Sequence, residues 1–209
     1  RTASGAFGTC PADNIDRQAV VSVVDWSTLP ECVERMGCAA PQLDQAMTEA
    51  GVEAEKVDGR RITDKNVLRL AKQTFRGTAN LDLVGALLKS GIPAVGLSGV
   101  DGGTLTLRKR PPVEMGGKDV DFGFVGDPVN VNPDLILSLI EADYVPAICS
   151  LGADIDGQVL NINADSLACE LAVGLSAEKL IFITDKPGIL HDPNDDSSIY
   201  SVLDASDIE

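Results

Sequence analysis

From residue 41 onward, apolar residues recur along the chain with two different periods. Helical spacing of Leu, Val, Ala and Met, bounded by capping residues and glycines, predicts helices over 41–50, 64–76, 78–90, 134–143 and 163–175. Asp64 and Thr78 are the predicted N-caps of the second and third helices, because a short polar side chain can accept hydrogen bonds from the first free amides. Gly77 is expected to end the second helix.

Strand-like patterns separate these helices. Residues 94–97, 145–149 and 179–184 are short, mostly apolar runs, typical of strands buried on both faces of a parallel sheet. Residues 104–107 and 120–122 instead alternate with period two and predict an antiparallel excursion, and 157–162 predict a hairpin arm. The alternation of helices and strands predicts an α/β fold with a largely parallel sheet. Residues 1–36 show no clear period.

Composition narrows the possible classes of protein. Among 209 residues, 17 are Lys or Arg and 32 are Asp or Glu, which gives a net charge of −15. Nucleic acids and anionic membranes attract clustered cations, so neither is an expected partner. No apolar run reaches the roughly 18 residues of a transmembrane helix, and no signal-peptide pattern is recognised. Five cysteines without a C-x-x-C pair predict a reduced, cytoplasmic protein.

Some kinds of chemistry are excluded by what the sequence lacks. His191 is the single histidine, so mechanisms and metal sites that need two histidines are excluded, and we predict no metal-ligand residues. The chain has no G-x-x-x-x-G-K-[ST] motif and is therefore not a P-loop enzyme. Cys149 and Cys169 lie in apolar runs and are expected in the core.

Three short polar segments lie where an α/β sheet binds ligands, at strand ends or helix starts. Asn161, Asn163 and Asp165 alternate before a helix, so they can face one side and meet a substrate that carries a carboxylate and an amide. Residues 184–188 follow the last strand, where a nucleotide can bind. Arg61 precedes a helix start, where a guanidinium can pair with a carboxylate. Each segment alone also fits an ordinary cap, turn or solvated arginine.

Together, these segments occur in the order typical of one enzyme family. The chain resembles the N-acetylglutamate kinases of the amino acid kinase family over residues 41–209. The resemblance rests on matching strings at Pro41–Leu43, Val57–Asp64, Ala94–Gly99, Asp121–Gly126, Asn161–Asp165, Thr184–Asp185 and Gly188–Leu190. It implies a three-layer αβα sandwich around a mainly parallel open sheet. An atypical segment (1–40) would precede an amino-acid-substrate lobe (41–175) and the start of a truncated nucleotide-binding lobe (176–209).

The activity that the resemblance implies is the ATP-dependent phosphorylation of the side-chain carboxylate of N-acetyl-L-glutamate to an acyl phosphate, in arginine biosynthesis. Mg²⁺ would bridge the phosphates of ATP. Arg61 would grip a substrate carboxylate, and Asn161 would hold the acetylglutamate with Asn163 close by. Asp165 would be the catalytic residue that orients the two lysines of the family. We expect Arg61, Asn161 and Asp165 to converge on one pocket, and we expect a homo-oligomer.

The resemblance also places nucleotide and phosphate contacts. The resemblance implies that three residues would lie against the adenine nucleotide: Thr184, Asp185 and Gly188. The family's glycine-rich loop is replaced here by residues 37–40, where the backbone amides of Ala39 and Ala40 can still point at a phosphate although their Cβ atoms crowd the loop.

Two departures keep other interpretations open. The family's Lys-x-Gly-Gly tetrad is absent from the sequence, and its second lysine belongs to a segment beyond residue 209. One alternative is a related kinase that acts on a carrier-protein-linked aminoadipate or glutamate. The other is a non-catalytic family member that binds a ligand.

Overall fold

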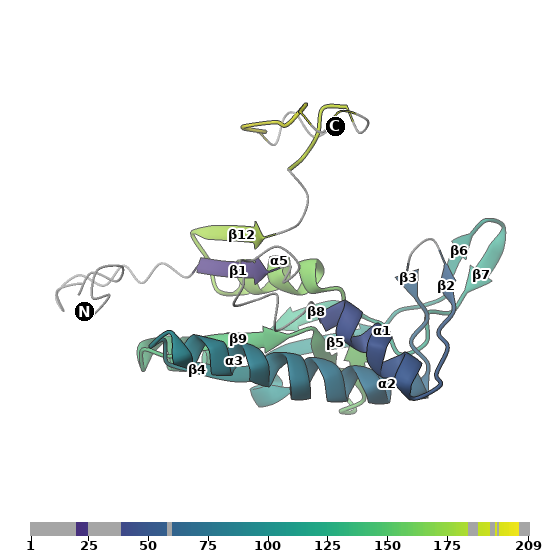
Figure 1. Ribbon diagram of the computed structural model, residues 1–209, viewed down its shortest axis with the longest axis horizontal. Coiled ribbons are helices and arrows are strands. Elements are labelled where there is room, and N and C mark those ends of the chain that lie inside the picture. The colour runs from purple at the N-terminus through teal and green to yellow at the C-terminus, as the bar shows by residue number, and fades with distance from the viewer. Residues whose placement is uncertain are drawn as a thin grey trace.

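The computed structural model describes residues 20–24, 39–57, 60–183, 188–192, 195 and 197–204. Figure 1 labels most of its helices and strands. In chain order, the elements are β1 (Val20–Val24), α1 (Ala39–Glu49), β2 (Lys56–Val57), β3 (Arg60–Arg61), α2 (Lys65–Ala71), the π-helix η1 (Lys72–Ala79), α3 (Asn80–Lys89), β4 (Ala94–Ser98), the 3₁₀ turn η2 (Asp101–Gly103), β5 (Leu105–Lys109), β6 (Val113–Met115), β7 (Lys118–Val120), β8 (Gly126–Val131), α4 (Asp134–Glu141), β9 (Val145–Cys149), β10 (Leu151–Ala153), β11 (Val159–Asn161), α5 (Ala164–Gly174) and β12 (Lys179–Ile183).

The strands combine parallel and antiparallel pairs. β1 pairs in parallel with β12, and β4 in parallel with β9. A four-stranded sheet has the order β11-β10-β5-β8, in which β10 and β5 are parallel and the other pairs antiparallel. The β4–β9 pair leads into this sheet, because the Gly99 amide donates to the Leu151 carbonyl at 2.7 Å. The β5–β8 pair and the β6–β7 hairpin confirm the predicted antiparallel excursion, and the β10–β11 pair confirms the hairpin arm.

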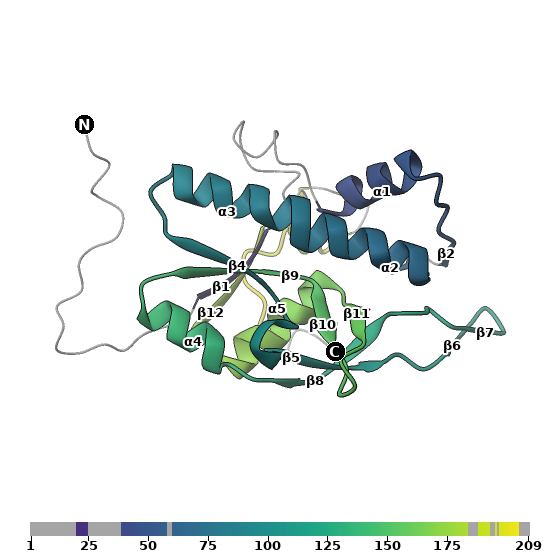
Figure 2. The same ribbon diagram turned by 90° about the horizontal axis from the view of Figure 1, so that it is seen from below.

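Helices cover both faces of this β layer, as Figure 2 shows. Helices α1, α2 and η1 pack on β10 around a cluster of buried residues made of Leu43, Met47, Val67, Leu70, Ala71, Phe75 and Leu151. Helices α4 and α5 pack against β5 and β11 around a second cluster, made of Leu105, Leu107, Ile136, Leu160, Ile162, Leu167 and Leu171. The α/β class and the three-layer αβα arrangement are therefore confirmed. The predicted lobe boundaries at residues 40 and 175 stay predictions.

The predicted break between the second and third helices is wrong. α2, η1 and α3 follow one another without interruption from Lys65 to Lys89, and Gly77 and Thr78 lie inside the π-helical stretch. No side chain caps α3, whose preceding residue Ala79 is itself helical. Glycine costs a helix only about 1 kcal/mol. Burial of Phe75 before Gly77 and the buried hydrogen bond from Asn80 to the Ala147 carbonyl after it offset that cost and keep the segment helical.

Smaller differences concern where elements begin and end. α1 begins at Ala39, two residues before the expected start, and β7 ends at Val120, so that Asp121 and Phe122 lie outside any strand. The predicted Asp64 cap is confirmed, because its carboxylate accepts from the amides of Asn66 and Val67, each at 2.8 Å. In the part of the chain that the structure describes, no helix is both long and apolar enough to span a bilayer.

Candidate active site

Arg61 sits at the end of the small β2–β3 hairpin, where it is paired with Lys56 of the neighbouring strand. Its side chain is only 16% exposed and reaches toward α1, where Nη2 donates to Oδ1 of Asp44. Nε of Arg61 is buried and has no hydrogen-bond partner among the described residues. The other oxygen of Asp44 lies 3.8 Å from Nζ of Lys56, so one carboxylate serves two cations of the hairpin.

Thr63 joins the hairpin to the body of the protein. Its amide donates to the Phe122 carbonyl at 3.0 Å, and its carbonyl accepts from the Phe124 amide at 2.7 Å. Gly123, between these two partners, has φ +74°, and a Cβ there would lie 2.3 Å from the Thr63 carbonyl oxygen. Only glycine allows the two segments to approach so closely.

Asn161 also pairs with the segment that contains Gly123. Its amide donates to the Phe124 carbonyl at 2.8 Å, and its side-chain Nδ2 donates to Oγ1 of the fully buried Thr63 at 3.4 Å. Side chains alternate along an extended chain, so Arg61 and Thr63 point to the same side. The structure therefore joins Asn161 to Thr63, which lies two residues from Arg61 along the chain.

Asn163 and Asp165 lie at the start of α5. Oδ1 of Asn163 accepts from the Ser166 amide at 2.9 Å and from its hydroxyl at 3.2 Å, so Asn163, rather than Asp165, is the N-cap of this helix. Asp165 follows in the first turn, where the helix dipole favours a negative charge. Within the described ranges, its carboxylate makes no hydrogen bond or ion pair and no contact with Arg61 or Asn161 is found. The convergence of all three residues stays a prediction.

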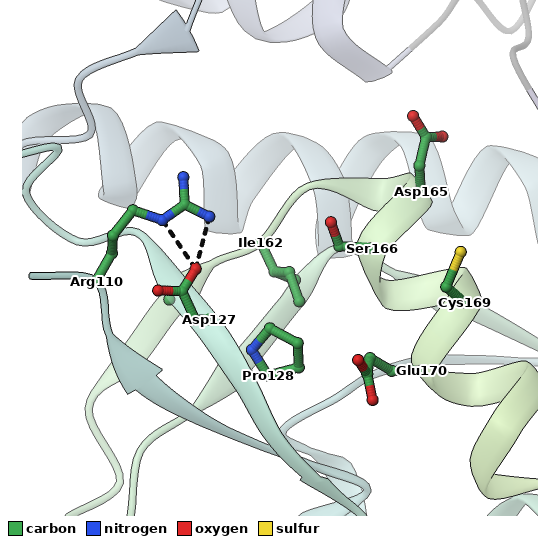
Figure 3. A pocket seen from close by; sticks show the side chains of 9 residues that line it. Arg110, Asp127, Pro128, Ile162, Asp165, Ser166, Cys169 and Glu170 are labelled. Atoms are coloured by element: carbon green, nitrogen blue, oxygen red, sulfur yellow. Dashed lines mark hydrogen bonds and ion pairs between the residues drawn. The ribbon is translucent and has the colours of Figure 1, made fainter. Parts of the chain in front are cut away.

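A pocket of about 340 Å³ lies beside this helix start. Figure 3 shows two of its walls. On one wall, Nε and Nη2 of Arg110 both donate to Oδ1 of Asp127, at 2.8 and 2.6 Å. The carboxylate of Asp165 points away from this pair (Figure 3). The complete lining consists of Arg110, Gly126, Asp127, Pro128, Ile162, Asp165, Ser166, Cys169 and Glu170.

Cys169 belongs to this pocket and is exposed, so its predicted place in the core is wrong. Helical geometry explains the difference, because positions 165 and 169 are four residues apart and share one face of α5. Cys149, in contrast, is partly buried, and this burial raises the pKa of its thiol to about 12.

The predicted phosphate and nucleotide contacts are only partly described. Ala39 and Ala40 form the first turn of α1, where amides have no acceptor within the helix. Thr184 and Asp185 lie outside the described residues. Gly188 is exposed with φ +146°, a conformation that L side chains rarely adopt.

A polar network at the end of β4 has no counterpart among the predicted site residues. Asp101 accepts from the amide and the hydroxyl of Ser98, both at 2.7 Å, and lies 3.6 Å from Nε of Arg76. Burial alone would raise the pKa of Asp101, but the Ser98 hydrogen bonds and the Arg76 charge outweigh it and lower the pKa. Arg76 also donates to buried Asn80, whose Nδ2 donates to the Ala147 carbonyl at 2.8 Å. The network fixes η1 against β4 and β9.

Sequence reasoning also missed Asp44 and Thr63. Each acts on a predicted site residue far away in the chain, 17 residues from Asp44 to Arg61 and 98 from Thr63 to Asn161. A short motif contains no signal for such a contact.

Comparison with known proteins places the chain in a family. The profile of the Amino acid kinase family matches residues 37–209, and the chain belongs to this family. It is 45% identical over 174 residues to the acetylglutamate kinase of Myxococcus xanthus (strain DK1622), a match that covers 80% of this chain and 56% of that protein. It is 41% identical over 169 residues to the acetylglutamate kinase of Methanopyrus kandleri (strain AV19), covering 81% and 68%.

Among solved structures, smu.665 from Streptococcus mutans UA159 matches with a TM-score of 0.65 at 24% identity, over 83% of this chain and 74% of that one. At this identity the likeness supports the fold only. The match to the Amino acid kinase family profile confirms the family membership that the motifs predict. The chain spans 56% of the length of the Myxococcus xanthus protein and 68% of that of the Methanopyrus kandleri protein.

Proposed function

We propose that the protein transfers the γ-phosphoryl group of ATP to the side-chain carboxylate of N-acetyl-L-glutamate, a step of arginine biosynthesis. The observation that carries the proposal is the 3.4 Å hydrogen bond from Asn161 to Thr63, two residues from Arg61, in a chain 45% identical to an acetylglutamate kinase. In the proposed site, the guanidinium of Arg61 and the side-chain amide of Asn161 would both face the substrate. An acetylated amino acid offers the matching groups, a carboxylate and a secondary amide.

Each side chain would have one role. Arg61 would bind a substrate carboxylate with the N–H groups that Asp44 does not use. The side-chain Nδ2 of Asn161 donates a hydrogen bond to Oγ1 of Thr63, which leaves Oδ1 of Asn161 to accept from the substrate amide. Asn163 uses its oxygen to cap α5, which leaves its nitrogen to donate. Asp165 would orient ammonium groups near the reacting phosphoryl.

The reaction itself asks little of the protein. A carboxylate oxygen of the substrate attacks the γ-phosphorus, the bond from that phosphorus to the β–γ bridging oxygen breaks, and ADP leaves. The carboxylate is ionised at neutral pH, so no base is needed. Catalysis is then positioning and charge neutralisation.

Mg²⁺ would enter with the phosphates of ATP, whose negative charge it neutralises when bound. Among the described residues, no three His, Cys, Asp or Glu side chains lie close enough together to bind a metal ion alone. Thr184, Asp185 and Gly188 would contact the nucleotide, and the amides of Ala39 and Ala40 would face a phosphate. We also propose that the protein forms a homo-oligomer.

Hydroxylamine trapping tests the proposal directly, because it converts an acyl phosphate into a hydroxamate that ferric iron colours. Purified protein with ATP, Mg²⁺ and N-acetylglutamate should give hydroxamate, and omission of ATP or of acetylglutamate should abolish it. Glutamate and aminoadipate, free and carrier-linked, are the comparison acceptors. Faster reaction with a carrier-linked acceptor would replace the proposal with the related carrier-dependent kinase.

A second candidate is a ligand-binding protein without turnover. It is favoured by the carboxylate of Asp165, which has no cationic partner in the described part of the chain. Calorimetric binding of acetylglutamate together with a negative hydroxamate assay would select this candidate over the kinase.

A further inference from the structure

We propose that Asp44 is a positioning residue that holds the Arg61 guanidinium in the orientation that receives the substrate carboxylate. This inference rests on the proposed function, since it deepens the role of the same site. It starts from the ion pair between α1 and the β2–β3 hairpin, in which Nη2 of Arg61 donates to Oδ1 of Asp44.

The guanidinium has little freedom but few partners. It is 16% exposed, and its Nε is buried without a hydrogen-bond partner in the described part of the chain. A buried donor without a partner is unfavourable, so the side chain gains by swinging toward water. Asp44 opposes this motion by accepting from Nη2.

Asp44 uses only part of the guanidinium. Oδ1 of Asp44 accepts from Nη2 of Arg61, while Oδ2 lies 3.8 Å from Nζ of Lys56. An arginine side chain has five N–H donors in a fixed plane, so Nη1 and the second hydrogen of Nη2 remain for a second acceptor. Holding one corner of this plane at Asp44 restricts the directions in which the free N–H groups can point.

Two possible roles of Asp44 predict opposite changes in substrate affinity when its charge is removed. Asp44 is a negative charge next to a site for an anion. If it acted only by repulsion or by competing for Arg61, its neutralisation would tighten substrate binding. If it positions Arg61, its neutralisation weakens binding.

Asp44→Asn is the test, with the Kd of N-acetylglutamate measured by calorimetry and KM and kcat by the hydroxamate assay. We expect Kd and KM for acetylglutamate to rise about fivefold to tenfold, less than the loss of a direct charge-assisted hydrogen bond, because Asp44 acts on the substrate only through Arg61. KM for ATP should be unchanged and kcat should change less than twofold. Asp44→Glu keeps the carboxylate and should recover most of the affinity. Unchanged or tighter acetylglutamate binding in Asp44→Asn would overturn the inference.

Two further variants separate positioning from other effects. Glu49→Gln makes the same charge change on α1, but Glu49 contacts Gln45 at 2.8 Å and not the hairpin, so the affinity should stay unchanged. Lys56→Gln removes the other cation on Asp44. A rise in Kd equal to that of Asp44→Asn would mean that Asp44 docks the hairpin rather than orienting Arg61, and would overturn the inference.

A measurement without substrate keeps this inference distinct from the proposed function. Phenylglyoxal modifies arginines, and peptide mass spectrometry follows the adduct on Arg61. Release of Arg61 in Asp44→Asn should raise its rate of modification several-fold, with no change in Glu49→Gln. An unchanged rate would overturn the inference even in an active enzyme. A raised rate in a protein that neither binds nor phosphorylates acetylglutamate would leave the ion pair standing and refute the proposed function.

Discussion

Replacing Gly123 with alanine should destabilise the fold at the point where the hairpin joins the body. Gly123 has φ +74°, and an added Cβ would lie 2.3 Å from the carbonyl oxygen and 3.0 Å from the carbonyl carbon of Thr63. Both atoms belong to the backbone of a fully buried residue, so no side-chain rotation can relieve the clash. The Thr63 segment must move, and its 2.7 Å hydrogen bond from the Phe124 amide is lost.

The magnitude follows from three contributions. A left-handed conformation costs alanine about 1–2 kcal/mol. Crowding against a rigid neighbour costs about 1–3 kcal/mol, and the lost hydrogen bond about 1 kcal/mol. The expected loss is thus about 3–6 kcal/mol, a large part of the roughly 5–15 kcal/mol that stabilises a typical protein.

Gly117→Ala is the matched control, because Gly117 has φ +78° in the β6–β7 turn and a Cβ there would meet nothing within 4 Å. It should lose only the conformational cost of about 1–2 kcal/mol. Urea unfolding followed by far-ultraviolet circular dichroism gives both free energies of unfolding. Equal losses in the two variants would refute the claim that the approach of Thr63 requires a glycine at position 123.

Three other predictions concern single side chains. Arg61→Lys should weaken acetylglutamate binding at least about tenfold in calorimetry, since an ammonium lacks the planar fork that pairs with a carboxylate; equal affinity would contradict its role. The pKa of Asp101 is lower in the folded protein than its ordinary value of 3.8, so the ionised carboxylate stabilises the fold at pH values above 3.8. This stabilisation is lost as the pH falls through the folded-state pKa. Between neutral pH and pH below 4, the free energy of unfolding measured with urea should therefore fall less in Asp101→Asn than in the wild type. Equal decreases in the two proteins would contradict this. Burial raises the pKa of Cys149 to about 12, so iodoacetamide at pH 8 should label exposed Cys169 much faster, and comparable rates in peptide mass spectrometry would contradict this.

The sequence predicts those features whose partners lie nearby in the chain. Asp64 and Asn163 cap their helices as expected, because the amides they accept from are two or three residues away. The strands of the β4–β9 pair are also predictable, since their apolar runs are short and bounded by glycine, proline or polar residues. In each case the local pattern agrees with the tertiary structure.

Features that depend on packing are not predictable in this way. Gly77 and Thr78 form a convincing stop and start in the sequence, but buried neighbours keep the helix continuous through them. Cys169 lies in an apolar run, yet only the helical period shows that it shares a face with Asp165 rather than with Leu167 and Leu171.

The candidate site is predictable in its residues but not in its contacts. Arg61 and Asn161 stand out as chemistry-bearing residues, whereas Thr63, to which Asn161 donates, reads as an ordinary residue before a helix cap. The joining contact spans 98 residues, and nothing in either local sequence specifies the other.

The hydrogen bond between Thr63 and Asn161 makes formation of the site a non-local event of folding. A loop of 98 residues must close before its hydroxyl can meet Asn161, and closing such loops is entropically costly and slow. A ligand that touches both ends of this loop binds the native state and not the open chain. At a concentration of a hundred times its Kd, such a ligand would add about 2.7 kcal/mol to the free energy of unfolding. A thermal shift caused by acetylglutamate would then report how completely the two distant halves of the chain have come together.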